Sequence, residues 1–152
     1  MEPRTLFKAL RIALGSLLVA GIAPALLADD GPYGRCSNWS VAGPYGYTTT
    51  GTRIGVGPVA GVGLVTLGRD GSISGSQTVS FNGTIADETI TGTYTVNADC
   101  AGQVTVNVVS SIPTFNRTST LDFVWVNHSD AVHAIFTSAG TIITLDGQKV
   151  NP

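Results

Sequence analysis

Charged residues are scarce in this chain of 152 residues, where they make up 12% of the sequence. Beyond the N-terminal segment the basic residues form no patch, and nucleic acid is not an expected partner, because its phosphates bind clusters of Lys and Arg. Leu, Ala, Glu and Lys are sparse after residue 30, which argues against a helix-rich fold. Glycine, serine and threonine are abundant instead, a composition typical of an extracellular β protein.

Long apolar runs are absent outside the N-terminal segment. Residues 1–28 have the plan of a secretory signal peptide, with basic residues first, an apolar stretch from Ile12 to Ala23 next, and small residues after it. The apolar stretch is short for a bilayer span. We predict cleavage after Ala28, with Ala25 as the alternative. The mature protein would be secreted or periplasmic, with five basic and nine acidic residues and a net charge of −4.

Cysteine is nearly absent as well, since only Cys36 and Cys100 occur. In an exported protein, a single pair of cysteines predicts a disulfide. The bridge would close the 64 residues from position 36 to position 100, which the chain-entropy account converts to about 4 kcal/mol of stabilisation. The alternative is a pair of buried thiols.

Patterns that carry catalysis or bind metal are missing too. The chain has no Gly-x-Ser-x-Gly nucleophile elbow, no arrangement for Cys–His catalysis and no phosphate-binding glycine loop before a helix. His128, Asp130 and His133 come nearest to a metal site, but strand alternation places the two imidazoles on opposite faces. We predict no catalytic residue, no metal and no cofactor, and we favour a protein that is not an enzyme while leaving the question open.

Mostly apolar residues alternate with Ser and Thr at a period of two, most clearly between Gly63 and Ala101. Such alternation is typical of β-strands, whose successive side chains leave on opposite faces. Short turns separate eight such segments and leave no room for helical crossovers, so neighbouring strands should pair antiparallel. The predicted strands are residues 45–52, 59–68, 72–81, 89–97, 103–111, 118–127, 131–138 and 141–146.

Eight meandering strands can close on themselves, so we predict an all-β fold, an eight-stranded antiparallel up-and-down β-barrel. A β-sandwich is the alternative. The domain layout would be a signal peptide (1–28), an N-terminal arm (29–44) and a single barrel domain (45–152).

The two cysteines orient this barrel. Cys36 precedes the first strand and Cys100 follows the fourth, so both should lie at one end, with the longer loops at the other. Those longer loops include residues 53–58, 82–88 and 112–117. Any cavity should therefore open at the loop end, which we call the mouth, while the disulfide closes the floor.

The predicted ligand-binding residues lie at the mouth and in the lumen. Arg53, Phe115 and Arg117 are rim candidates, because an aromatic ring beside a guanidinium can hold a small hydrophobic, anionic or sugar-like ligand. The alternative is that Phe115 caps the barrel and both arginines are solvated. Gln77 and Tyr94 are candidate polar groups of the lumen, with core packing as the alternative. The pair of acidic residues at 87 and 88 is expected to be solvated in a rim loop.

Strands five to seven are apolar on both faces, as in Val124 beside Phe123 and Ile135 beside Phe136. A strand with two apolar faces is usually covered on both. These strands therefore predict a surface for homo-oligomer formation, and scattered apolar surface residues are the alternative.

Three sequence segments carry a resemblance to known proteins. They are C-x-x-x-S-x-x-G-x-Y-G-Y from Cys36 to Tyr47, LGRDGSISG from Leu67 to Gly75, and GTYTV from Gly92 to Val96 followed by Cys100. Together they resemble a group of uncharacterised secreted bacterial β-barrel proteins. More loosely, the layout resembles calycin barrels (lipocalin and avidin-like) and the allene oxide cyclase barrel. The calycin resemblance implies a binding protein, and the cyclase resemblance implies an isomerase or cyclase.

Taken together, these patterns favour a secreted ligand-binding or interaction module whose ligand the sequence does not name. A cell-surface or matrix assembly subunit and a cyclase- or isomerase-like barrel enzyme are the alternatives. A lumen with room inside would favour a carrier or an enzyme, and a filled lumen would favour an interaction module.

Overall fold

The computed structural model describes residues 35–150, so the predicted signal peptide lies outside the described residues. The chain enters through a short helix, α1 (Asn38–Val41), which a capping box between Ser37 and Ser40 begins. The strands are β1 (Gly43–Arg53), β2 (Gly57–Leu67), β3 (Ser72–Phe81), β4 (Thr84–Val96), β5 (Ala101–Ser110), β6 (Arg117–Val126), β7 (Ala131–Phe136) and β8 (Thr141–Lys149). Two single-turn 3₁₀ helices, η1 (Pro113–Phe115) and η2 (Asn127–Ser129), stand between strands.

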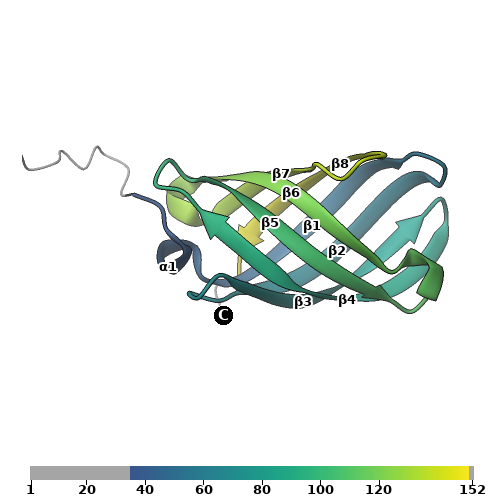
Figure 1. Ribbon diagram of the computed structural model, residues 1–152, viewed down its shortest axis with the longest axis horizontal. Helices are drawn as coiled ribbons and strands as arrows, with labels where there is room; N and C mark the ends of the chain where they lie inside the picture. Colours follow the sequence, from purple (N-terminus) through teal and green to yellow (C-terminus); the bar gives the residue numbers. More distant parts are fainter. Residues whose placement is uncertain (1–34, 151–152) are drawn as a thin grey trace, which may run out of the picture.

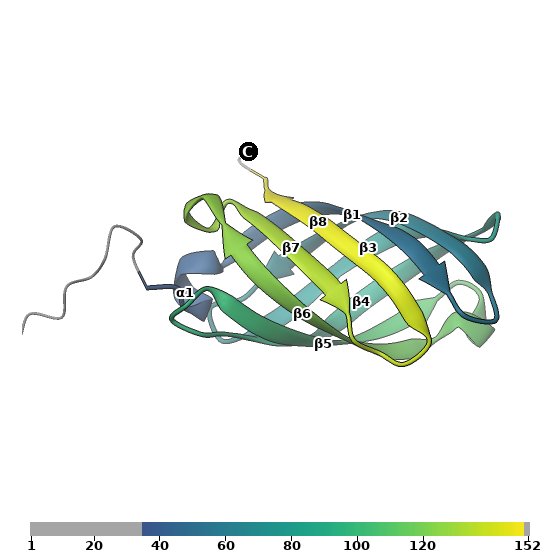
Figure 2. The ribbon, with the colours of Figure 1, turned by 90° about the horizontal axis from the view of Figure 1, so that it is seen from above.

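The eight strands form a closed antiparallel barrel, which confirms the predicted fold (Figures 1 and 2). Each strand pairs with the next along the chain, and β8 returns to pair with β1, with Tyr45 opposite Lys149. Closure leaves no free sheet edge. The sandwich alternative is therefore wrong.

Two boundaries differ from the sequence predictions. The loop predicted for residues 82–88 is only a two-residue turn, because Asn82 and Gly83 adopt positive φ angles of 48° and 91°, the backbone that a tight hairpin requires. β4 therefore starts at Thr84 and carries residues 87 and 88 inside the sheet. At the other end of the chain, β8 continues to Lys149, beyond the predicted end at residue 146, because it is held by its pairing with β1.

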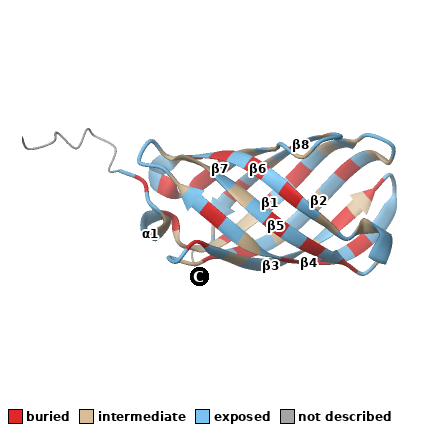
Figure 3. Cartoon of the chain, in the orientation of Figure 1, coloured by how far each residue is buried: buried red, intermediate tan, exposed pale blue. Residues whose placement is uncertain are grey.

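Buried and exposed residues alternate along the strands (Figure 3), because successive side chains of a strand point to the lumen and to the outside in turn. Along β4, for example, Ala86, Glu88, Ile90 and Tyr94 are buried, while the residues between them are largely exposed. The outward positions of β3 and β4 carry mostly Ser and Thr, which meet across the strands in pairs such as Ser74 with Thr91.

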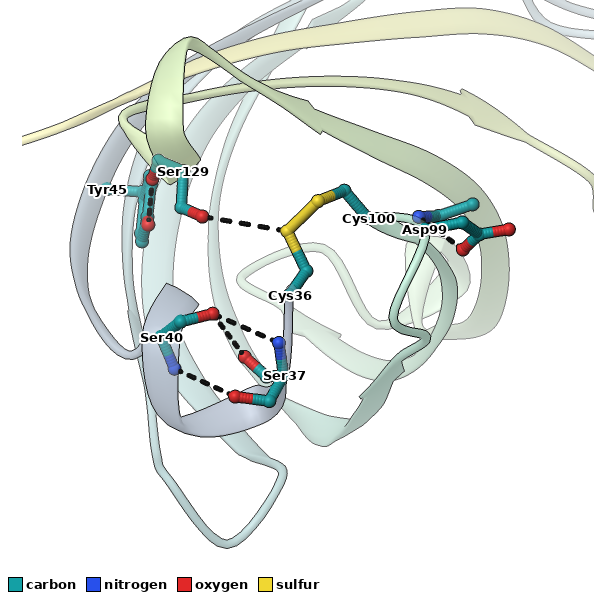
Figure 4. Close-up of a disulfide and its surroundings, with 8 residues drawn as sticks. Cys36, Ser37, Ser40, Tyr45, Asp99, Cys100 and Ser129 are labelled. Carbon is teal, nitrogen blue, oxygen red and sulfur yellow. Dashed lines mark hydrogen bonds between the residues drawn. A yellow bond between two sulfur atoms is a disulfide. The ribbon is translucent and has the colours of Figure 1, made fainter. Parts of the chain in front are cut away.

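The floor is closed by the disulfide and by α1, as predicted (Figure 4). Cys36 and Cys100 are bonded, with Cα atoms 4.9 Å apart. Val41 of α1 has no exposed surface, and its carbonyl oxygen accepts a hydrogen bond of 2.8 Å from the Tyr45 hydroxyl. Asn38 accepts a second bond from the Val96 amide, so the arm is tied to β1, β4 and the turn after it.

The outer face of β6 and β7 does carry exposed apolar side chains, Val124 and Ile135. Each faces a polar partner on the neighbouring strand, His133 and Asp122 respectively. On its other side Val124 faces Ala101 of β5, and β5 exposes a further apolar side chain, Val109. Self-association through these strands stays a prediction. Among residues 35–150, no helix has the length and hydropathy needed to cross a membrane.

Candidate functional site

The lumen contains two separate apolar clusters, one at each end of the barrel. The larger, which we call the floor cluster, is built by Val41, Tyr45, Tyr47, Val65, Leu67, Ile90, Tyr94, Val106, Val108, Leu121, Phe123, Trp125 and Val132. The smaller, which we call the mouth cluster, is built by Val59, Val79, Phe81, Ala86 and Ile143. A single cluster is the usual arrangement in one domain, so the separation needs a cause.

The cause is a layer of polar side chains that crosses the lumen between the clusters. Tyr47 of β1, Gln77 of β3, Glu88 of β4 and Arg117 of β6 all point inward, and we call these four residues the polar layer. The Tyr47 hydroxyl donates to Gln77 Oε1 over 2.8 Å, and Gln77 Nε2 donates to Glu88 Oε2 over 2.5 Å. Arg117 completes the chain from the opposite wall.

Glu88 and Arg117 form a bidentate ion pair inside the barrel. Arg117 Nη1 lies 2.6 Å from Glu88 Oε1, and Nη2 lies 2.8 Å from Oε2. The Glu88 side chain has no exposed surface and that of Arg117 is 15% exposed. Arg117 Nη1 also donates to the Phe115 carbonyl over 3.0 Å, and its guanidinium lies over the Phe81 ring at 5.2 Å. A buried carboxylate requires such complete pairing, because removing it from water costs several kcal/mol.

The pair also sets the electrostatics of the layer. Burial raises the pKa of the Tyr47 hydroxyl above its ordinary range, and the Glu88 carboxylate raises it further, while Arg117 opposes them. Tyr47 is therefore a neutral hydrogen-bond donor at physiological pH.

Below the polar layer lies a cavity of about 100 Å³, which we call the floor cavity. Its wall is almost wholly apolar, with side chains from all eight strands. Trp125 belongs to this wall, and its Nε1 is the one fully covered side-chain polar atom in residues 35–150 that has no hydrogen-bond partner. The Tyr94 hydroxyl lies at the floor, 2.7 Å from the Gly68 carbonyl and 3.1 Å from that of Asn38.

Above the polar layer lies a second cavity of about 130 Å³, which we call the mouth cavity. Gln77 and Arg117 line both cavities, so the polar layer is their common partition. Part of the lining of the mouth cavity is apolar, formed by residues such as Phe81 and Phe136. The lining also carries hydroxyl groups and a second guanidinium, that of Arg53.

The structure distributes the five predicted site residues over the whole lumen. Arg53 lines the mouth cavity, as a rim residue should. Arg117 is not on the rim, because it lies in β6 with its charge paired to Glu88. Phe115 packs on Phe81, with ring centroids 4.6 Å apart, and covers part of the mouth. Gln77 faces the lumen within the polar layer, and Tyr94 faces it at the floor.

Sequence reasoning missed Glu88 and the inward role of Tyr47. The signal for Glu88 was present, since the alternation of Ile90, Gly92 and Tyr94 places Glu88 on the same face when it is extended towards the N-terminus. The expected loop hid it, and the solvated position predicted for this carboxylate is wrong. Nothing in the sequence pairs Glu88 with Arg117, because β5 separates their strands and they meet only across the lumen.

The predicted absence of a metal site rested on His128, Asp130 and His133. His133 instead meets Asp146 on the outer face, with 2.6 Å between Nδ1 and Oδ1. Among residues 35–150, no three His, Cys, Asp or Glu side chains are grouped so as to hold a metal ion.

Comparison of the chain with models of known protein families found no match, and comparison with curated proteins found none either. The resemblances to secreted, calycin and cyclase barrels therefore stay predictions. The function has to be argued from the lumen itself.

Proposed function

We propose that this protein is an exported carrier that binds a small molecule inside its barrel. The observation that supports the proposal is the lumen, which holds two cavities of about 100 and 130 Å³ in line between mouth and floor. A barrel of eight strands is just wide enough for side chains to fill it or for one small ligand. Inward positions such as 61 and 63 are occupied by glycine, which has no side chain to fill the lumen.

The cavity sizes set the scale of the ligand. An apolar protein cavity of about 150 Å³ holds one benzene molecule. On this scale each cavity has room for about four to five non-hydrogen atoms, or for one part of a longer ligand that displaces the polar layer. Export is supported by the disulfide between Cys36 and Cys100, since such bridges persist in oxidising compartments.

Native mass spectrometry of the exported protein tests the proposal directly. We expect a mass above that of the chain, which returns to the chain mass when the protein is denatured, together with a released small molecule. A matched variant, Val106→Phe, fills the floor cavity from within its wall and should lower the bound fraction. A wild-type protein that carries no molecule, and takes up none from a library of small metabolites, would refute the proposal.

Intrinsic fluorescence gives a second readout of the same site. The chain has two tryptophans, of which Trp39 on α1 is 66% exposed and Trp125 lines the floor cavity. In a Trp39→Phe variant, the remaining signal reports the lumen alone. A ligand in the lumen should shift this emission, whereas a molecule bound to the outer surface should leave it unchanged.

One observation favours a second candidate, an isomerase or cyclase. The Glu88–Arg117 pair places ionised groups, with the Tyr47 hydroxyl, beside an apolar cavity, where electrostatic stabilisation of a reacting molecule is strongest. Ligands recovered from the wild type and from Glu88→Gln would distinguish the two roles. A carrier returns the same compound from both proteins, whereas an enzyme returns different compounds.

A further inference from the structure

We propose that the mouth cavity is a binding site for a small monocarboxylate, and that Arg53 holds its carboxylate group. This inference rests on the proposed function and names the chemical class of the ligand. Four features of the mouth cavity support it: an unpaired cation, the lack of a lining acid, two unpartnered hydroxyls and an apolar wall.

The first feature is the state of Arg53. Its side chain is partly buried and lines the mouth cavity, at the end of β1. Among residues 35–150, it has no ion pair and no side-chain hydrogen bond. A guanidinium offers a planar fork of donors that matches a carboxylate in a bidentate geometry. An anion that enters the cavity would form an ion pair with the Arg53 guanidinium.

The second feature is the charge of the lining. Arg53 and Arg117 are the only charged residues that line the mouth cavity in the described part of the chain. Glu88 already neutralises Arg117, and both terminal nitrogens of that guanidinium are engaged. The surplus of about one positive charge therefore belongs to Arg53. The electrostatic potential inside the mouth cavity therefore attracts anions, although the mature chain as a whole carries a net negative charge.

The third feature is a pair of hydroxyl groups. Thr49 and Ser119 are 6% and 3% exposed, and both line the mouth cavity. In the described part of the chain neither hydroxyl has a protein partner, and neither oxygen is fully covered, because Trp125 Nε1 is the one fully covered side-chain polar atom without a partner there. Hydroxyls that reach a cavity can donate to a molecule inside it. Thr49 lies on β1 with Arg53, and Ser119 lies on β6, so two strands offer hydroxyl donors to one carboxylate.

The fourth feature is the apolar part of the lining and the size of the space. Phe81, Phe136 and Ile143 present hydrocarbon surface to the cavity. With about 130 Å³ available, the cavity has room for about five non-hydrogen atoms. The expected ligand is therefore a short-chain monocarboxylic acid with a compact apolar group, of the size of propionate.

Titration calorimetry with propionate and its neutral analogue propionamide tests the assignment, because the two differ chiefly in charge. We expect the wild type to bind propionate at least about tenfold more tightly than propionamide, the ratio expected for a charge-assisted hydrogen bond. Arg53→Gln should abolish this preference, and Arg53→Lys should keep part of it. Thr49→Val and Ser119→Ala should each weaken propionate binding by about three- to tenfold.

The matched control is Arg69→Gln, which removes the same charge at the floor end of the barrel. Arg69 lies over the exposed Trp39 ring at 4.5 Å, outside both lumen cavities. It should leave propionate binding unchanged. Thermal unfolding of each variant verifies folding, and Arg53→Gln should fold normally because Arg53 has no side-chain partner to lose in residues 35–150.

The outcomes separate this inference from the proposed function. Equal binding of propionate and propionamide, or a preference that survives Arg53→Gln, would overturn the carboxylate site. So would no binding of propionate, with the lumen hydroxyls satisfied by water alone. In each of these cases a neutral molecule found in the lumen by native mass spectrometry would still uphold the carrier. Absence of any lumen ligand, propionate included, would defeat both.

Discussion

The two ends of the lumen are built from the same strands but differ in how they are closed and in how their polar groups are paired. The floor cluster is large and is closed by α1 and a disulfide, and the hydroxyls of Tyr45 and Tyr94 are tied to backbone carbonyls. The mouth cluster is small, and beside it lie a cation and two hydroxyls for which the described part of the chain supplies no partner. The contacts that stabilise the fold are therefore concentrated at the floor, whereas the polar groups available to a ligand are concentrated at the mouth.

The largest expected effect comes from breaking the partition between the two ends. Glu88→Gln removes the charge that pairs with Arg117 and should lower the free energy of unfolding by about 3 to 5 kcal/mol, because a buried guanidinium is left uncompensated. The double variant Glu88→Leu with Arg117→Met should recover most of the loss. Urea unfolding measures both. A single variant as stable as the wild type would mean that the pair adds nothing to the fold.

The next largest effect is expected from removing the disulfide at the floor. Replacing Cys36 and Cys100 together by Ser should cost about 2 to 4 kcal/mol, since the bridge closes a separation of 64 residues. If the floor is only a support for the mouth, the disulfide-free protein should still bind its ligand at temperatures where it is folded. Loss of binding in a fully folded protein would contradict the division of roles between the ends.

A smaller effect tests how glycine makes room for the polar layer. A Cβ added to Gly63 would lie 2.6 Å from the Tyr47 ring and 2.8 Å from Gln77 Cβ. Gly63→Ala should therefore displace the Tyr47–Gln77 hydrogen bond and cost about 1 to 3 kcal/mol. Gly83→Ala is a useful comparison, because no atom lies within 4 Å of its added Cβ and only the positive φ of 91° opposes it. Similar losses of ligand affinity in both variants would argue against a crowded layer.

The smallest expected effect is a loss of stability at alkaline pH. Burial raises the pKa of Tyr94 from its ordinary value of 10.0 to about 12, and the pKa values of Tyr45 and Tyr47 are also raised by burial. A raised pKa in the fold means that stability is fully present below about pH 10 and is lost as the pH rises through the folded values. Urea midpoints from pH 9 to pH 12 should fall, with tyrosinate absorbance appearing as the protein unfolds. A Tyr94→Phe variant should show a weaker fall, and constant midpoints to pH 12 would contradict buried tyrosines.

Much of the fold was predictable because it depends on local patterns. Alternation located all eight strands, and the positions of the two cysteines relative to the first and fourth strands placed the disulfide at one end. The site was less predictable. Arg53 lines the mouth as expected, but Arg117 was assigned to the rim, although β6 carries it into the wall. The turn at Asn82–Gly83 was predicted as the start of a loop, and this single boundary hid the inward position of Glu88.

The sequence by itself determined which residues share a face of each strand, because side chains in a strand alternate whatever its partners are. It also determined the order of the strands, since short turns allow only neighbours in the chain to pair. Only the tertiary structure decided which inward side chains meet across the lumen. Glu88 and Arg117 lie on strands that are not neighbours in the sheet, and curvature of the closed wall brings them together. Pairing across a lumen depends on barrel closure and register, which no single strand encodes. Since Glu88 pairs with Arg117, Arg53 has no acidic partner at the mouth among residues 35–150.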